Sequence, residues 1–259
     1  MNLVRSLVRK LYPHGAVRSV LRGPLRGTRF VVLPGMAATY ALGVDSMHCR
    51  FLAERLHAGD VVYDIGGNCG QMALFFSRQV GDTGKVCSFE PVPQNAATLR
   101  RNLALNACGN VEVIEAAVAA DSEPRTFCFD TAHHTMGTLQ GAMVKLDSWD
   151  TSFQVACVTL DGFLEQGGKP PQVLKIDVEG SGLGVIEGAV NLIEQHRPAI
   201  YFELHAADEK APELLAVQIL RERWGYRVND LNGTLQDTLN PMWGGAVWCE
   251  PGSRLENNG

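Results

Sequence analysis

From residue 60 onward the chain alternates between short apolar segments and longer amphipathic ones, and this order constrains its fold more than any other feature. Strand-like segments cover residues 61–65, 85–90, 111–118, 173–176 and 199–204. Helix-like segments cover residues 70–80, 94–106, 183–195 and 212–224. This alternation predicts a parallel sheet with helices on both faces. Two last strands, at 227–229 and 246–249, flank an Asn232-Gly233 turn signal, which predicts a hairpin and a total of seven strands.

The composition is that of an ordinary globular protein. Of the 259 residues, 46% are apolar and 20% are charged, which fits one α/β domain with a short appendage. The net charge of −5 argues against a nucleic-acid-binding protein, because contacts with phosphates require a basic surface. No apolar run approaches the roughly 20 residues of a membrane-spanning helix. The seven cysteines include no C-x-x-C pair, so we expect reduced thiols and a cytoplasmic location.

Positive charge is concentrated at the N-terminus. Residues 1–44 contain seven Lys and Arg side chains and no Asp or Glu, and apolar residues at helical spacing predict a short basic helix over 2–11. We therefore expect a basic N-terminal segment, 1–50, that packs as a cap on a catalytic domain, 51–255. Contact with a membrane surface or an acidic partner is one alternative, and a cleaved targeting peptide is another.

A glycine-rich loop, Asp64-Ile65-Gly66-Gly67-Asn68-Cys69-Gly70, joins the first of these strands to its helix. Glycine permits positive φ and a close approach of the backbone to a ligand. The spacing of Gly66, Gly67 and Gly70 differs from the G-x-G-x-x-G of a dinucleotide-binding loop. The carboxylate of Asp64 suits the ammonium group of a methionyl ligand and repels phosphate.

A second acid, Glu90, ends the next predicted strand, 20 residues after Gly70. An acid at this place accepts hydrogen bonds from the hydroxyl groups of a ribose. By themselves the two acids fit NAD as well as S-adenosylmethionine. Asp64 and the glycine spacing favour S-adenosylmethionine.

Several motifs resemble those of the FkbM-like methyltransferases. The loop resembles that family's D-[IV]-G-A-N-x-G, and Phe89-Glu90-Pro91 its F-E-P. Four further segments also agree: Asn102-x-x-x-Asn106, Thr159-Leu160-Asp161, Lys175-Ile176-Asp177-Val178-Glu179-Gly180 and Phe202-Glu203-Leu204-His205. The resemblance runs from about residue 61 to residue 205, and the segment that begins at Lys175 is its most specific motif.

The resemblance implies a class I Rossmann-like α/β fold, with a seven-stranded, mostly parallel sheet, helices on both faces and a C-terminal antiparallel hairpin. It also implies an S-adenosylmethionine-dependent O-methyltransferase that acts on a small molecule such as a sugar, a glycan or a natural product. The residues expected to bind the methyl donor are Asp64, Gly66, Gly67, Asn68, Gly70, Glu90, Ala117 and Asp177. Two departures from the family pattern are Gly67 in place of alanine and Ser181-Gly182-Leu183-Gly184 in place of an acidic run. We expect a usable loop and a late start of the following helix.

Four polar residues are the expected catalytic group. Asp177 and Glu179 end one strand, and Glu203 and His205 end its expected neighbour, so all four face the site at the carboxyl ends of the strands. His205, with an ordinary pKa near neutrality, is the preferred general base for a hydroxyl acceptor; a structural histidine is the alternative. Asp177, Glu203 and His205 alternatively hold magnesium or manganese. We expect Lys175 to pair with a neighbouring acid.

An insertion at about 121–158 contains two strand-like stretches, 125–129 and 154–158, around a polar segment with His133 and His134. A segment of this length in a compact domain is typically functional or unstructured. We expect it to cover the acceptor site, and a surface loop whose histidines bind nothing is the alternative.

Three other functions stay open. A nicotinamide-dependent oxidoreductase is disfavoured by Asp64 and by the glycine spacing. A non-catalytic module that binds S-adenosylmethionine is disfavoured by the intact acids. Methylation at nitrogen is disfavoured because the chain has no N-P-P-[YF] sequence.

Overall fold

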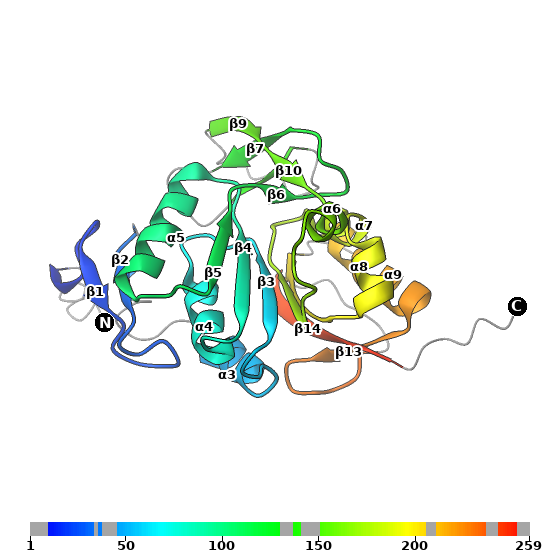
Figure 1. Ribbon diagram of the computed structural model, residues 1–259, viewed down its shortest axis with the longest axis horizontal. Coiled ribbons are helices and arrows are strands. Elements are labelled where there is room, and N and C mark those ends of the chain that lie inside the picture. Colours follow the sequence, from blue (N-terminus) through cyan, green and yellow to red (C-terminus); the bar gives the residue numbers. More distant parts are fainter. Residues whose placement is uncertain are drawn as a thin grey trace, which may run out of the picture.

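The computed structural model describes residues 10–33, 36–37, 46–129, 137–140, 151–205, 211–236 and 243–252. A seven-stranded sheet lies at its centre, between two groups of helices (Figure 1). Within these ranges no helix has the length and apolar character needed to cross a bilayer. Most of the helix predicted over 2–11 lies outside the described residues, as do His133 and His134.

The sheet has the strand order β13-β14-β12-β11-β3-β4-β5. The strands span Tyr226–Asp230 (β13), Trp243–Pro251 (β14), Ala199–His205 (β12), Val173–Ile176 (β11), Val61–Ile65 (β3), Lys85–Phe89 (β4) and Val111–Ile114 (β5). Only β14 runs antiparallel to its neighbours, so the predicted sheet and hairpin are confirmed. The direction of strand addition reverses between β3 and β11, and ligands bind at such a switch point in open α/β sheets.

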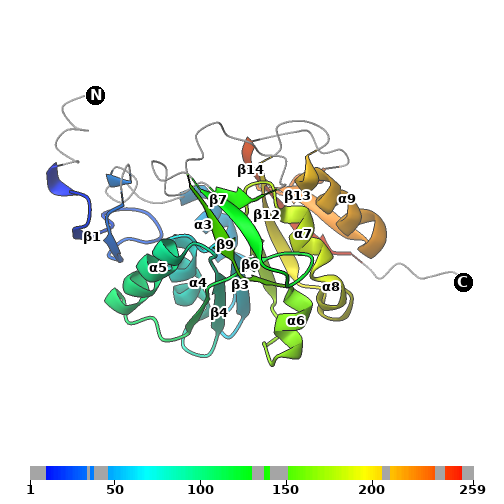
Figure 2. The same ribbon diagram turned by 90° about the horizontal axis from the view of Figure 1, so that it is seen from above.

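Helices cover the two faces of the sheet in separate groups. They span Ser46–Ala53 (α3), Gln71–Val80 (α4), Pro93–Leu105 (α5), Leu160–Glu165 (α6), Gly182–Glu187 (α7), Val190–His196 (α8) and Pro212–Trp224 (α9). The first three lie on one face and the other four on the opposite face (Figure 2). Because strand side chains alternate, Tyr63 packs with the second group and Val62 with the first. Burial on both faces explains why the strands are mostly apolar.

The helix predicted over 183–195 is two helices, α7 and α8. They separate at Gly188, where a Cβ would lie 2.1 Å from the carbonyl oxygen of Ala119. The carboxylate of Asp161 accepts hydrogen bonds from the backbone N–H groups of Asn191 and Leu192 in the first turn of α8. Asp161 therefore stabilises the start of the second helix. The first helix begins at Gly182, with Ser181 as its N-cap, so the run that was expected to delay the helix forms its first turn.

The described N-terminal residues pack on α5. They form the antiparallel pair β1 (Val17–Ser19) and β2 (Arg29–Val31). The backbone N–H of Val31 donates to Asn102 Oδ1 at 2.9 Å, and the side chain of Asn106 bonds both the N–H and the carbonyl group of Arg29. The two asparagines of the family-like motif therefore attach the N-terminal segment to the domain.

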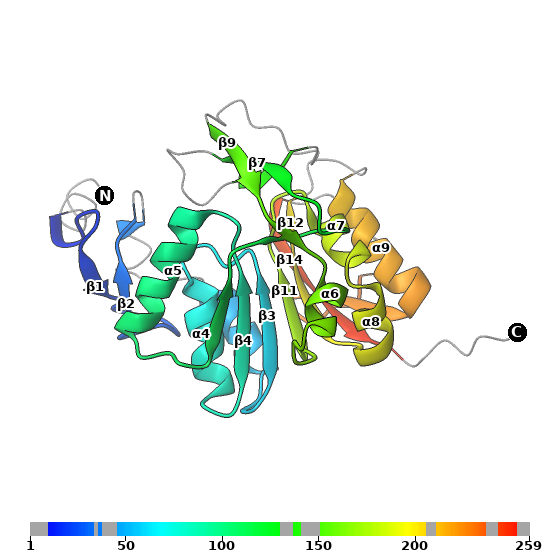
Figure 3. The same ribbon diagram turned by 45° about the horizontal axis from the view of Figure 1, so that its top comes forward.

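The insertion contributes a three-stranded antiparallel sheet beside the carboxyl ends of the central strands (Figure 3). We call it the inserted sheet; its strands are β8 (Gly137–Leu139), β7 (Arg125–Phe129) and β9 (Thr151–Val155), with β7 in the middle. A short parallel pair, β6 (Ala117–Val118) and β10 (Cys157–Val158), forms at the two ends of the insertion.

Candidate functional site

The glycine loop lies in the crevice between β3 and β11. Gly66 has a φ of +86°, and a Cβ at this residue would lie 1.9 Å from the carbonyl oxygen of Asp177. Gly70, with a φ of +90°, is the residue that precedes α4. Asn68 has a φ of +47°, a conformation that asparagine adopts more readily than most residues. The loop therefore depends on residues that tolerate positive φ, and position 66 has no room for a side chain.

Glu90 is buried beside this loop, with 4% of its surface exposed. Its Oε2 accepts a hydrogen bond from the N–H of Asn68 at 2.7 Å, and its Oε1 accepts from the N–H of Val92 and the side-chain amide of Asn95. Burial raises the pKa of Glu90 to about 7, although these hydrogen bonds oppose the shift. Since each carboxylate oxygen has two lone pairs, Glu90 retains capacity for a ligand hydroxyl.

A row of polar side chains crosses four neighbouring strands. The strand register places Ser88 beside Asp64, Asp64 beside Lys175, and Lys175 beside Tyr201. Ser88 Oγ donates to Asp64 Oδ2 at 2.9 Å, and Lys175 Nζ lies 3.2 Å from Asp64 Oδ1. The hydroxyl of Tyr201 is hydrogen-bonded to Nδ1 of His48 on α3. We call the four strand residues the polar row.

Lys175 is the cation of the polar row, with 3% of its surface exposed. Besides Asp64, its Nζ contacts the carbonyl oxygen of Gly66 at 2.9 Å and Asp177 Oδ2 at 3.3 Å, so all three N–H donors have an acceptor. Burial lowers the pKa of Lys175, but the carboxylates of Asp64 and Asp177 raise it by more, and the side chain is charged. The predicted pairing of Lys175 with an acid is confirmed.

Asp64 differs from its predicted role as the direct partner of a ligand's ammonium group. Its side chain is fully buried, and it lines neither of the two cavities at the site. The reason is the strand register, which places a lysine beside it. Asp64 instead supports the loop from below, through Lys175 and the carbonyl group of Gly66.

The four predicted catalytic residues meet at the carboxyl ends of β11 and β12. The Nε2 atom of His205 lies 3.7 Å from Asp177 Oδ1 and 3.6 Å from Glu179 Oε1. It lies 3.8 Å from Glu203 Oε1. His205 is buried, and burial lowers the pKa of its imidazole. The structure therefore brings together the residues that sequence reasoning grouped, with the imidazole among three carboxylates.

Two further features show how closely the acids of this cluster are packed. Burial raises the pKa of Glu179 to about 7, and the nearby carboxylates of Asp177 and Glu213 add to the shift. Glu213, with 1% of its surface exposed, lies in the first turn of α9, where the helix dipole favours a carboxylate. Glu213 was not predicted from the sequence, because α9 joins the cluster only in the folded chain.

Two cavities lie on either side of the glycine loop, and Gly66, Asn68 and Asp177 line both. Both are partly open, with about 640 and about 710 Å³ of empty space that includes open solvent. The loop and the end of β11 therefore stand where the two cavities join.

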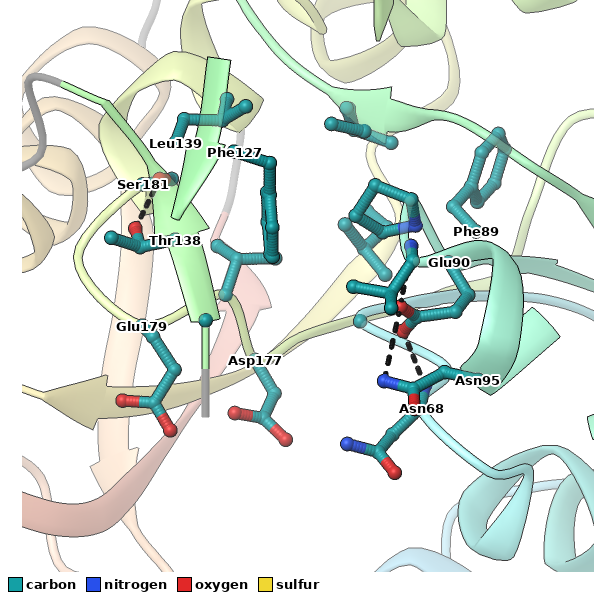
Figure 4. A pocket seen from close by; sticks show the side chains of 18 of the residues that line it. Asn68, Phe89, Glu90, Asn95, Phe127, Thr138, Leu139, Asp177, Glu179 and Ser181 are labelled. Atoms are coloured by element: carbon teal, nitrogen blue, oxygen red, sulfur yellow. Dashed lines mark hydrogen bonds between the residues drawn. The ribbon is translucent and has the colours of Figure 1, made fainter. Parts of the chain in front are cut away.

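The first cavity, the Glu90 cavity, lies between Glu90 and the inserted sheet (Figure 4). Ala117, expected to contact a donor, lines it together with Phe127 and Leu139 of the inserted sheet. The described part of the insertion, which we expected to cover the acceptor site, therefore lines the Glu90 cavity. Phe127 and Leu139 were not predicted as site residues, because they reach this cavity only through strand pairing within the insertion.

The second cavity, the His48 cavity, is lined by His48, Tyr201, Glu203 and Lys175, among others. His48 comes from α3, a helix that sequence analysis did not predict. The sequence did not indicate His48 as a site residue, because it is a single histidine upstream of the motifs.

Comparisons with known proteins give a family match and a curated relative. A family model for the methyltransferase FkbM domain matches residues 64–228, more than half of the chain. The hexuronic acid methyltransferase AglP of Haloferax volcanii is 28% identical over 163 residues, which cover 61% of this chain and 61% of that protein. The chain thus spans about three fifths of the length of this curated relative.

A solved structure shows a similar fold. A candidate rRNA methylase from Clostridium thermocellum superposes with a TM-score of 0.50 at 12% identity, over 80% of this chain and 95% of that one. An FkbM methyltransferase from Methylobacillus flagellatus has a TM-score of 0.49 at 19% identity, over 74% of this chain and 43% of that one.

Proposed function

The chain belongs to the FkbM methyltransferase family, and from this premise we propose that it transfers a methyl group from S-adenosylmethionine to a hydroxyl group of a small molecule. The junction of the two cavities at Gly66, Asn68 and Asp177 carries the proposal. A donor that lies across this junction would place its nucleoside and amino-acid ends in different cavities. Its reacting centre would then lie beside the predicted catalytic residues.

The residues of the Glu90 cavity fit the nucleoside end of this donor. Glu90 would accept hydrogen bonds from the ribose hydroxyls, and Ala117 would contact the base. When bound, S-adenosylmethionine supplies an electrophilic methyl group on a sulfonium centre. The loop at Gly66 and Asn68, supported by Lys175, would position that centre, and the anionic cluster suits its positive charge.

On the acceptor side, we propose His205 as the general base. Methyl transfer is an in-line displacement, so the protein must align the acceptor and remove its proton. Burial lowers the pKa of the His205 imidazole and so favours the neutral form that can accept that proton, and the carboxylates of Asp177, Glu179 and Glu203 would stabilise the imidazolium that forms. The named activity of the Haloferax volcanii relative favours a sugar, such as a hexuronic acid, as the acceptor.

Binding measurements test the donor assignment. Isothermal titration calorimetry of the full chain should detect S-adenosylhomocysteine and no NAD. Gly66→Val should abolish this binding, because its side chain would collide with the carbonyl group of Asp177. A preference for NAD would support the oxidoreductase alternative and refute the proposal.

Turnover measurements test the base. With labelled donor and a panel of hexuronic acids and neutral sugars, His205→Ala should lower kcat by about 10²–10⁴-fold while the affinity for S-adenosylhomocysteine changes little. His196→Ala, at an exposed position on α8, is the matched control. Near-normal turnover in His205→Ala would exclude His205 as the base. Donor binding without methyl transfer to any tested acceptor would instead favour a non-catalytic module.

A second mechanism is favoured by the spacing of Asp177, Glu203 and His205, whose potential ligand atoms all lie within 4.8 Å of one another. An oxygen and nitrogen set of this kind suits magnesium or manganese, which would lower the pKa of an acceptor hydroxyl. Titration with manganese alone, followed by electron paramagnetic resonance, should then detect one site that Asp177→Asn removes. Full activity in the presence of a chelator would exclude this mechanism.

A further inference from the structure

The inserted sheet presents an apolar face to the Glu90 cavity, and on its other face Thr126 and Cys128 of β7 are partly exposed. On β7, Phe127 and Phe129 are buried in a cluster with Val92 and Ala117 of the domain. Thr126, which precedes Phe127 on the strand, instead accepts a hydrogen bond from the side chain of Gln154 at the exposed side. Alternation along the strand thus separates an apolar inner face from a polar outer face.

The inner face lies opposite the polar groups of the cavity. Phe127 and Leu139 are on the side that faces Glu90 and Asn95 (Figure 4). The cavity therefore has an acid on one wall and an aromatic and aliphatic surface on the other. A ligand that carries hydroxyl groups and a flat apolar ring matches both walls, because aromatic side chains favour stacking or edge contacts with such a ring.

The position of the Phe127 ring depends on Gly137 of the neighbouring strand β8. A Cβ at Gly137 would lie 2.5 Å from Cε1 of the Phe127 ring and 3.0 Å from the carbonyl oxygen of Cys128. The ring occupies the space that any other residue would take. A side chain at position 137 would therefore displace the ring from its place at the cavity.

The inserted sheet is also bonded to the loop after β11. Thr138, with 1% of its surface exposed, has its Oγ1 3.0 Å from Ser181 Oγ. Ser181 closes the turn that begins at Val178, directly after Asp177, and in this turn Glu179 and Gly180 have φ values of +35° and +87°. The hydroxyl pair thus joins the wall of the Glu90 cavity to the segment that holds two of the predicted catalytic acids.

We propose that the inner face of the inserted sheet, through Phe127 and Leu139, is the wall that receives the purine ring of the methyl donor. The Thr138–Ser181 hydrogen bond couples ligand binding at this wall to residues 177–181, the segment that carries Asp177 and Glu179. This proposal rests on the proposed function, because it assumes a nucleoside donor in the Glu90 cavity. It assigns a donor-binding role to an insertion that the family-like motifs do not include.

Calorimetric titration of the full chain with S-adenosylhomocysteine and with adenosine tests the wall. Phe127→Ala should weaken both ligands by the same factor, roughly tenfold or more. Gly137→Ala should do likewise although it keeps the aromatic ring. Thr126→Val, on the outer face of the same strand, is the matched control and should stay within about twofold of the wild type. Thermal melts without ligand should show that each variant is folded.

The outcomes separate the two proposals. A wild-type chain that binds neither probe overturns the proposed function itself. If the wild-type chain binds both probes and the affinities of Phe127→Ala and Gly137→Ala are unchanged, only the proposal that this wall receives the purine ring is overturned. A Thr126→Val variant as weak as Phe127→Ala also overturns it, because the effect then comes from the folding of the inserted sheet.

Hydrogen–deuterium exchange tests the connection through Thr138. S-adenosylhomocysteine should protect the amides of residues 137–139 and 177–181 in the wild type. In Thr138→Val the second segment should lose this protection while the first keeps it, and Thr138→Ser should restore both. Equal protection of residues 177–181 in Thr138→Val would refute the connection.

Discussion

The buried pair of Lys175 and Asp64 gives the most direct test of the structure. In Lys175→Met the Asp64 carboxylate would stay fully buried, with Ser88 as its remaining hydrogen-bond partner. At the observed 3.2 Å, the attraction that is lost is about 5 kcal/mol at an effective dielectric constant of about 20. Removal of one partner of a buried pair typically costs about 3–5 kcal/mol.

Protonation of Asp64 sets an upper limit on this cost. A variant that cannot hold the buried charge takes up a proton instead, which costs about 4 kcal/mol at pH 7 and about 1.5 kcal/mol at pH 5. In this variant the folded-state pKa of Asp64 would be raised. A raised carboxyl pKa stabilises the folded state fully below the unfolded-state pKa, and this stabilisation is lost as the pH rises. We therefore expect Lys175→Met to be much less destabilising at pH 5 than at pH 7.

Urea unfolding at both pH values measures these free energies. Lys85→Met is the matched control, because Lys85 forms a salt bridge to Glu112 at 2.6 Å with both side chains partly exposed, and such pairs contribute about 0–1 kcal/mol. The double variant Asp64→Asn with Lys175→Met should recover most of the loss, since it leaves no buried charge unpaired. A cost below about 1 kcal/mol at pH 7, or an equal cost at the two pH values, would refute the reasoning.

Three further predictions concern the loop, the acidic cluster and the N-terminus. Gly67→Ala should lower the free energy of unfolding by about 1–3 kcal/mol, because its Cβ would lie 2.1 Å from Ser88 Oγ and displace the hydroxyl bonded to Asp64; unchanged urea unfolding would contradict this. Glu179 should contribute a fall in wild-type stability of up to about 3 kcal/mol as the pH rises from about 4.5 to about 7, because its folded-state pKa is raised. The decline in Glu179→Gln should be smaller by this amount, since Glu90, whose pKa is also raised, adds the same trend to both proteins; parallel pH profiles of the two proteins would count against it. Deletion of residues 2–11 should leave a folded chain that binds S-adenosylhomocysteine, because the contacts with α5 come from Arg29 and Val31; loss of either property in circular dichroism or calorimetry would disagree.

The sequence by itself determined the order of the elements and the local design of the loop. Strands buried on both faces must be apolar, and helices must be amphipathic, so the periodicity along the chain predicted the β3–α4–β4–α5 order. The sequence also predicted the role of Gly66 and Gly70 in the loop, because positive φ is a local property of the backbone. The grouping of Asp177, Glu179, Glu203 and His205 was also readable, since it required only that two parallel strands be neighbours.

The tertiary structure decided which side chains touch. Whether Asp64 meets a ligand or Lys175 depends on the register of β3 against β11, and no residue within either strand encodes that register alone. Glu213 joins His205, and Phe127 reaches the Glu90 cavity, only after α9 and the inserted sheet have packed. These arrangements arise from the pairing and burial of different elements, so periodicity and spacing along the sequence carry no signal for them.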